Sequence, residues 1–141
     1  MKTSVMLSIC GRQTYMDQEP DVIELVTEGT MEYREGGWEI RYEETDLTGL
    51  SGVTTTFRVE PEKVILTRSG KLSSEMVFQE GVSHSSLYQM EFGTMMITVC
   101  ATRIFAQLEQ GVGMVDLVYD IEIEQSAVGT VDYHLEIRPI N

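Results

Sequence analysis

Residues 117–124 read Leu117-Val118-Tyr119-Asp120-Ile121-Glu122-Ile123-Glu124, in which large apolar side chains alternate with acidic ones. The same rhythm recurs in residues 38–43 and in residues 131–138. A period of two places successive side chains on opposite faces of a strand. One face of each strand is therefore apolar and the other charged, which is typical of an antiparallel sheet that is covered on one side only.

Turn-forming residues separate these runs at regular intervals. They are found at Glu35-Gly36-Gly37, at Ser69-Gly70, at Gln110–Gly113 and at Ser126–Gly129. Helix signals are weak, and the best candidate, Arg103–Gln110, reads equally well as the end of a long strand. We therefore predict an all-β protein of about ten strands.

Strands of this number must protect their edges, and closure into a barrel removes edges altogether. Several predicted strands are long and joined by short hairpins, which favours a barrel over a sandwich of short strands. The fold prediction is a single antiparallel, calycin- or lipocalin-like barrel that occupies residues 1–141 as one domain.

Composition excludes several classes of function. The chain has 141 residues and a formal net charge of −13, from 23 acidic residues against 10 lysines and arginines. Nucleic acids and anionic membranes both require a basic surface, so neither is an expected partner. The apolar run after Lys2 is too short for a signal peptide, and Cys10 and Cys100 have no metal-binding or redox spacing. We expect a cytoplasmic protein with reduced thiols.

From Gly49 to Asn141 the chain resembles the YwiB-type family of small, uncharacterised bacterial β-barrel proteins. The blocks that carry the resemblance are Val64–Gly70, Met76–Phe78, Tyr88–Gly93, Met95–Thr102 and Leu117–Tyr119. The third block departs from the family pattern Tyr-x-Thr-Pro-Tyr-Gly, since Met90, Glu91 and Phe92 replace its Thr, Pro and second Tyr. The resemblance implies a cytoplasmic, calycin-like barrel, and it implies no activity.

Catalytic and metal-binding signals are poor. His84 lies beside Ser85 and Ser86 in a polar stretch without a nucleophile elbow, and His134 shares the charged face of its strand. The acidic run Glu43–Asp46 is read as a solvated strand end, with weak cation binding as the alternative. We expect no enzyme activity, no metal site and no cofactor.

One group of residues is suited to holding a ligand inside a barrel. Arg68 is in phase with apolar residues of its strand, as is Arg103, and a cation there could pair with an acidic apolar ligand. The alternative for both is that the side chain reaches water at the rim or forms a structural ion pair. Together with Tyr42 and Tyr119 they are the predicted ligand-binding residues.

Ten large side chains fall on the predicted inner face, and they could either fill the barrel or line a cavity. They are Trp38, Ile40, Tyr42, Phe57, Met76, Phe78, Met95, Ile97, Tyr119 and Tyr133. If they fill it, we expect a module that binds another protein or a second copy of itself. If they line a cavity of several hundred Å³, we expect a small apolar or acidic-apolar ligand in the lumen.

Overall fold

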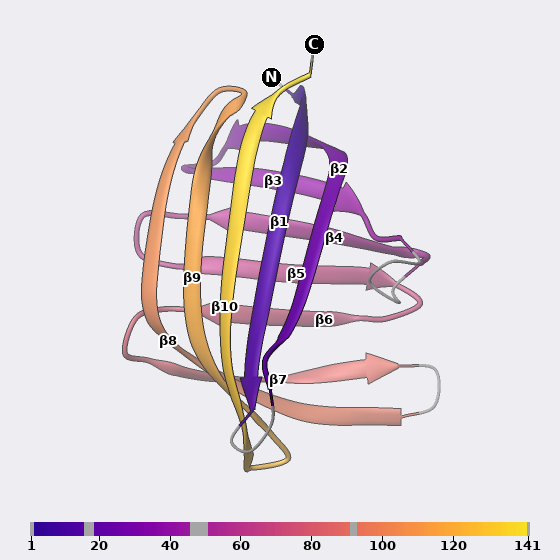
Figure 1. The fold of residues 1–141 in the computed structure, drawn as a ribbon, viewed down its shortest axis with the longest axis vertical. Helices are drawn as coiled ribbons and strands as arrows, with labels where there is room; N and C mark the ends of the chain where they lie inside the picture. The colour runs from indigo at the N-terminus through magenta and orange to yellow at the C-terminus, as the bar shows by residue number, and fades with distance from the viewer. Residues whose placement is uncertain (1, 16–18, 46–50, 91–92, 141) are drawn as a thin grey trace.

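The computed structural model describes residues 2–15, 19–45, 51–90 and 93–140, which form ten antiparallel strands of one sheet (Figure 1). The strands are β1 (Thr3–Tyr15), β2 (Asp21–Arg34), β3 (Gly37–Glu43), β4 (Val53–Val59), β5 (Val64–Gly70), β6 (Ser74–Phe78), β7 (Ser83–Met90), β8 (Gly93–Glu109), β9 (Val112–Ile123) and β10 (Ser126–Pro139). The predicted all-β class is confirmed.

The strand order in the sheet is β6-β5-β4-β3-β2-β1-β10-β9-β8-β7. Strands that are consecutive in the sequence are therefore neighbours in the sheet, except β6 and β7, which form its two edges. The first and last strands of the chain are thus neighbours in the middle of the sheet. The two edge strands approach each other where the backbones of Ser73 and Gln89 exchange hydrogen bonds of 2.9 and 2.8 Å. The result is a nearly closed barrel, consistent with the predicted calycin-like fold.

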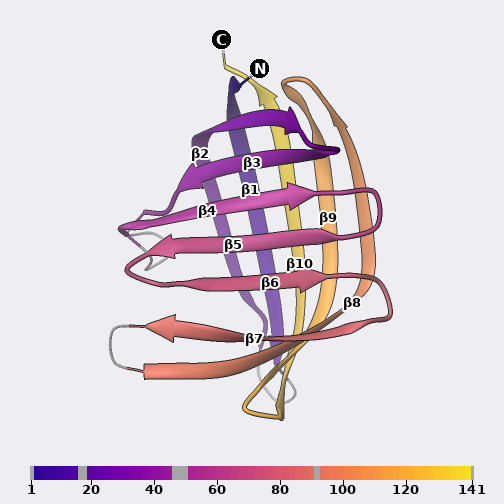
Figure 2. The same cartoon turned by 180° about the vertical axis from the view of Figure 1, so that it is seen from behind.

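Two layers of strands cross at a steep angle (Figures 1 and 2). One layer contains β1, β9 and β10, which run along the long axis, and the other contains β3 to β6, which run across it. The strand β2 starts in the first layer beside β1 and bends into the second, where it pairs with β3. The strand β8 also belongs to both layers, because it bends after it leaves its hairpin with β7. Its pairing with β9 shifts register between Ala101 and Arg103, as a β-bulge does. The helix candidate Arg103–Gln110 is wrong, since residues up to Glu109 continue β8.

The structure corrects two of the predicted turns. The predicted turn Ser69-Gly70 lies inside β5, where Gly70 pairs with Val53. Gly70 has φ 118°, and a Cβ there would lie 2.2 Å from the carbonyl oxygen of Gly52, so this close approach requires glycine. The predicted turn at Ser126–Gly129 is the start of β10, and the hairpin bends at the two residues before it.

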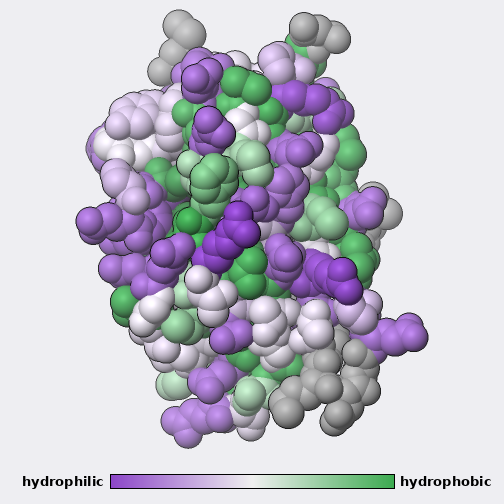
Figure 3. Space-filling view, turned by 60° about the vertical axis from the view of Figure 1, so that its left-hand side comes forward, coloured by the Kyte–Doolittle hydropathy of each residue, from purple (hydrophilic) through white to green (hydrophobic). Residues whose placement is uncertain are grey.

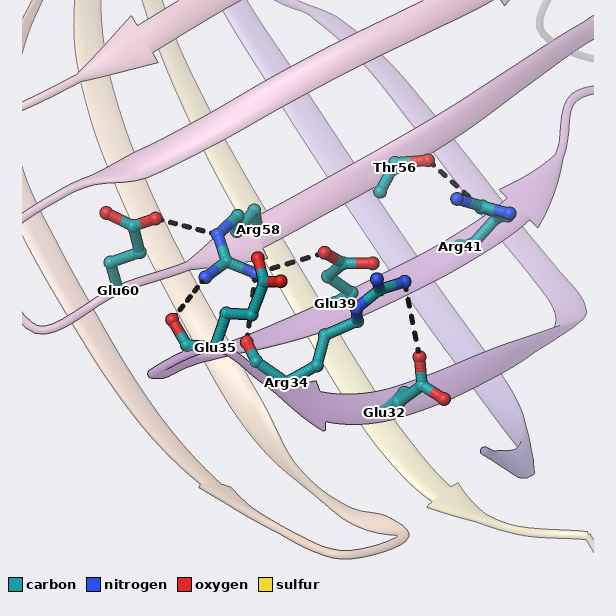
Figure 4. Close-up of polar contacts among 8 residues, drawn as sticks. All are labelled: Glu32, Arg34, Glu35, Glu39, Arg41, Thr56, Arg58 and Glu60. Carbon is teal, nitrogen blue, oxygen red and sulfur yellow. Dashed lines mark hydrogen bonds and ion pairs between the residues drawn. The ribbon is translucent and has the colours of Figure 1, made fainter. Parts of the chain in front are cut away.

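The hairpin between β2 and β3 is as predicted, and Arg58 of β4 holds it from outside (Figure 4). The guanidinium of Arg58 donates to the backbone oxygen of Arg34 at 3.2 Å and to that of Glu35 at 2.9 Å. It also binds the carboxylates of Glu39 and Glu60 at 3.0 and 2.7 Å. One side chain thereby satisfies two turn carbonyls and two acids on the outer face.

Among the described residues no helix is long and apolar enough to cross a membrane.

Candidate functional site

The inner face of the barrel borders a cavity of about 530 Å³ that is partly open to solvent. Its walls come from the later residues of β1, β3, β5, β7 and β9 and from the earlier residues of β2, β8 and β10, so it lies at one end of the antiparallel barrel. We call the residues that line it the open half of the lumen. They are Ile9, Gly11, Gln13, Ile23, Leu25, Tyr42, Glu44, Phe57, Leu66, Arg68, Met76, Tyr88, Met90, Met95, Ile97, Leu117, Tyr119, Ile121, Ile123, Val131 and Tyr133.

Away from the cavity the inner face is tightly packed, and we call its most deeply buried side chains the closed half. Its side chains do not reach the cavity and are at most 2% exposed. They are Val5, Leu7, Met31, Ile40, Val64, Phe78, Val99, Val115, Leu135 and Ile137. Of the ten large side chains predicted to face inward, seven line the cavity, whereas Trp38, Ile40 and Phe78 do not. The lumen is therefore filled at one end and hollow at the other.

A row of polar side chains crosses the inner face of four adjacent strands. Tyr42 pairs with Thr55, Thr55 pairs with Arg68 and Arg68 pairs with Ser74, so all four project from the same level of the sheet. Glu44 follows Tyr42 in the inward phase of β3, and its backbone N–H donates to Val53 at 2.8 Å. We call these five residues, Tyr42, Glu44, Thr55, Arg68 and Ser74, the polar row. Such a cluster inside an apolar lumen is what gives a ligand site its orientation.

Glu44 and Arg68 are the charged members of the polar row. The Glu44 side chain is 1% exposed, and its Oε2 lies 3.8 Å from Arg68 Nε, within ion-pair distance but too far for a hydrogen bond. The hydroxyl of Thr55 donates to the same Glu44 oxygen. The expectation of a solvated acidic run is thus wrong for Glu44, while Asp46 of that run lies outside the described residues.

Two polar atoms of the row are left without hydrogen bonds. Within the part of the chain that the structure describes, Arg68 Nε and Ser74 Oγ are buried and have no hydrogen-bond partner. The two residues are direct cross-strand partners, and Ser74 is only 6% exposed. A buried donor without an acceptor is costly, so these two atoms mark a place where an acceptor would be stabilised.

Three tyrosine hydroxyls stand around the same space. The Tyr42 and Tyr133 hydroxyls lie 3.3 Å apart and share a hydrogen bond. Burial raises the pKa of Tyr119 to about 12, and burial, reinforced by the negative charge of Glu44, raises the pKa of Tyr42 to about 12 as well. Burial also holds the pKa of Tyr133 well above its ordinary value. All three are therefore neutral near pH 7, when they can donate or accept hydrogen bonds.

The predicted ligand-binding residues divide into two groups. Arg68, Tyr42 and Tyr119 line the cavity together, from three different strands. The inward orientation predicted for Arg103 is wrong, because the bulge after Ala101 reverses the alternation of β8. Arg103 is exposed and pairs with Val118 on the outer face. The sequence reasoning missed Glu44 and Ser74, although the inward phase of Tyr42 was a usable signal for Glu44.

The histidines are placed away from the polar row. His84 Nε2 lies 3.3 Å from Gln79 Oε1, while the Ser85 hydroxyl bonds to Thr98 at 2.8 Å on the other face of β7. On the outer face, His134 Nδ1 lies 2.5 Å from Asp116 Oδ1, and this hydrogen bond raises the pKa of His134. In the described ranges no group of three or more acidic, histidine or cysteine side chains could hold a metal ion.

Comparisons with known proteins agree with this architecture. The model of a domain of unknown function, DUF1934, matches residues 7–137. This chain belongs to the DUF1934 family. The DUF1934 chain is also similar to the ywiB protein from Bacillus subtilis, whose crystal structure matches with a TM-score of 0.83 and 23% identity over 96% of this chain and 92% of that one. The resemblance read from the sequence is confirmed.

At 23% identity the ywiB likeness shows the fold alone. No curated protein matches this DUF1934 chain. Two residues of the motif in which the chain departs from the family pattern, Glu91 and Phe92, lie outside the described residues, and Met90 lines the cavity. The chemistry of the site must therefore be argued from the cavity itself.

Proposed function

We propose that this chain binds a small, largely apolar molecule in the open half of its barrel. The observation that carries the proposal is the cavity of about 530 Å³, which lies within the range of roughly 300–1,000 Å³ typical of small-molecule sites. A small barrel is commonly filled by its own side chains, so a cavity in one half of the lumen is not a necessary consequence of the fold.

The lining supports the same function. Most of the wall is aliphatic or aromatic, and Met76, Met90 and Met95 add flexible side chains that adapt to differently shaped apolar ligands. Three members of the polar row, Tyr42, Glu44 and Arg68, supply polar groups on one side of this wall. Apolar walls with few convergent polar groups are characteristic of sites that bind by burial and orient by hydrogen bonds.

The proposed role is binding without catalysis. His84 and Ser85 project to opposite faces of β7, whereas Ser86, the other serine considered from the sequence, shares the face of His84. The described contact of the His84 ring is with Gln79 Oε1. Two of the cavity's tyrosines, Tyr42 and Tyr133, share a hydrogen bond, and Glu44 accepts the hydroxyl of Thr55 and lies within ion-pair distance of Arg68. These contacts support a preorganised binding site.

The test uses the neutral dye N-phenylnaphthylamine, which fluoresces more strongly in apolar surroundings. Gly11 lines the cavity, and a Cβ there would be 3.8 Å from Tyr133, an ordinary contact. The variant Gly11→Leu would therefore project its side chain into the cavity. We expect saturable dye binding by the wild type and at least about tenfold weaker binding by Gly11→Leu.

The matched control is Arg12→Leu, which adds the same side chain on the opposite face of β1 and should leave the affinity within about twofold. Val131→Phe, which fills the cavity from β10, guards against a folding defect in Gly11→Leu. The proposal fails if the wild type shows no saturable binding, or if both cavity-filling variants fold and bind the dye like the wild type.

An interaction module, with a homodimer as its simplest form, is a second candidate. Tyr33 and Phe105 are 53% and 44% exposed and line a groove of about 480 Å³ with Trp38 and Ile104. Hydrophobic residues stand among hydrophilic ones on the side of the barrel that carries β8 (Figure 3). Light scattering tests it: a wild-type dimer that Phe105→Ser dissociates would support self-association, and a monomer at all concentrations would contradict it.

A further inference from the structure

Resting on the proposed lumen site, we infer that its ligand is uncharged at its polar end and presents an acceptor oxygen, such as an amide carbonyl, to Arg68 and Ser74. The sequence alone suggested an acidic ligand paired with Arg68. The buried surroundings of Arg68 point to a different chemistry, and three observations carry this inference.

First, the positive charge of Arg68 is already balanced. Glu44 lies within ion-pair distance of Arg68 Nε, and the two charges are equal and opposite. A ligand carboxylate placed next to Arg68 would also stand near Glu44, and like charges in a poorly solvated lumen repel strongly. A neutral head group avoids this repulsion, and it leaves the Glu44–Arg68 pair intact.

Second, a ligand cation is no better suited to the site. The Glu44 oxygen nearest Arg68 also accepts the hydroxyl of Thr55 and is flanked by Tyr42. A cation that displaced these contacts would stand beside the guanidinium of Arg68 in the same low-dielectric space. The charges of the polar row thus disfavour both signs of ligand charge.

Third, two buried groups of the polar row can donate hydrogen bonds that no described residue accepts. Arg68 Nε has only an N–H to offer, and Ser74 Oγ has a hydroxyl proton that no described residue accepts. Arg68 lines the cavity. Ser74 does not line it, but it is the cross-strand partner of Arg68 on the inner face, so the two side chains start from adjacent points of the sheet. One oxygen with two lone pairs would match these two donors, while the apolar remainder of the ligand would lie against the aliphatic wall.

The decisive experiment ranks two ligands that share one apolar chain. Decanamide and decanoate are used to displace N-phenylnaphthylamine from the full chain near neutral pH, where decanoate is ionised. We expect decanamide to displace the dye at a concentration at least about tenfold lower than decanoate. A wild-type preference for decanoate, or equal displacement by both, would overturn the inference.

Charge removal provides the sharper version of the test. In Glu44→Gln the repulsion is gone while Arg68 stays, so decanoate should gain at least about tenfold and decanamide should change less than about threefold. The matched control Glu75→Gln removes an exposed carboxylate from the outer face of β6 and should leave the ranking unchanged. A Glu44→Gln variant that folds and still rejects decanoate would count against the inference.

The donor assignment has its own variant. Ser74→Ala should weaken decanamide about fivefold, whereas Ser73→Ala, at an exposed neighbouring position, should not weaken it. If the dye binds but neither ligand displaces it, the head-group assignment is wrong and lumen binding still holds. If the dye itself does not bind, the proposed function has failed, so the two failures are distinguishable.

Discussion

The closed and open halves of the lumen use the same alternating strands but differ in what those strands place inside. In the closed half, branched and aromatic side chains meet across the barrel and leave no accessible space, as at Ile40 and Phe78. In the open half, Gly11 contributes no side chain, and Tyr42, Glu44 and Arg68 replace apolar bulk with hydrogen-bonding groups. The difference indicates a division of labour, in which one half supplies stability and the other supplies a cavity.

The largest expected effect compares one deletion in each half. Ile40→Ala removes a fully buried side chain from the closed half and should lower the free energy of unfolding by about 2–5 kcal/mol, because it creates a cavity in a filled core. Ile121→Ala removes a half-buried side chain that borders existing space, and should cost about 1 kcal/mol. Urea denaturation measures both. Equal losses would show that the two halves are packed alike.

A second comparison adds a methyl group to each half. A Cβ on Gly29 would lie 2.5 Å from the backbone oxygen of Arg41 and 2.7 Å from Leu7, so Gly29→Ala should destabilise by about 1–3 kcal/mol. A Cβ on Gly11 meets only Tyr133 at 3.8 Å, so Gly11→Ala should be neutral or stabilise by about 0.5 kcal/mol. Thermal unfolding of the two variants checks this, and a stability loss in Gly11→Ala would contradict the open half as described.

The sequence predicted the strands well because a period of two is a local property of each segment. It predicted the orientation of Tyr42, Arg68 and Tyr119 for the same reason. It failed for Arg103 because one extra residue in a bulge inverts every later side chain, and a bulge leaves little trace in an alternating pattern.

The hollow itself could not be predicted from the sequence. Whether inward side chains fill a barrel depends on strand tilt and stagger, which set its diameter and are properties of the closed sheet. The burial of Glu44 was missed for a related reason. An acidic run is ordinarily a solvated strand end, and only the pairing of β3 with β4 shows that its second member stays in the inward phase.

A third prediction concerns the support of the closed half from outside. Arg58→Met keeps the apolar stem but removes the hydrogen bonds to two turn carbonyls and two carboxylates, and should destabilise by about 1–2 kcal/mol. Arg41→Met removes one 3.3 Å hydrogen bond to Thr56 on the same face and should stay within about 0.5 kcal/mol. Urea denaturation of both variants measures this difference. If Arg58→Met unfolds like the wild type, the Arg58 contacts do not stabilise the hairpin.

The last predicted effect is a loss of stability at high pH, which is absent at neutral pH. It tests whether the open half of the lumen is apolar or hydrated. Burial raises the pKa of Tyr119 and of Tyr42 to about 12 in the folded chain, compared with about 10 in an unfolded one. The fold therefore favours the neutral hydroxyl. This contribution to stability is complete below about pH 10 and is lost as the pH rises toward about 12. We expect urea midpoints to fall over that interval, and Tyr119→Phe to reduce the fall.

Ultraviolet absorbance of tyrosinate follows the same groups directly. If the cavity were filled with bulk-like water, the tyrosinates would be hydrated, and Tyr42 and Tyr119 would titrate near pH 10. A late phase near pH 12 would instead show that the hollow half is as desolvated as the filled one, as a site for an apolar ligand requires.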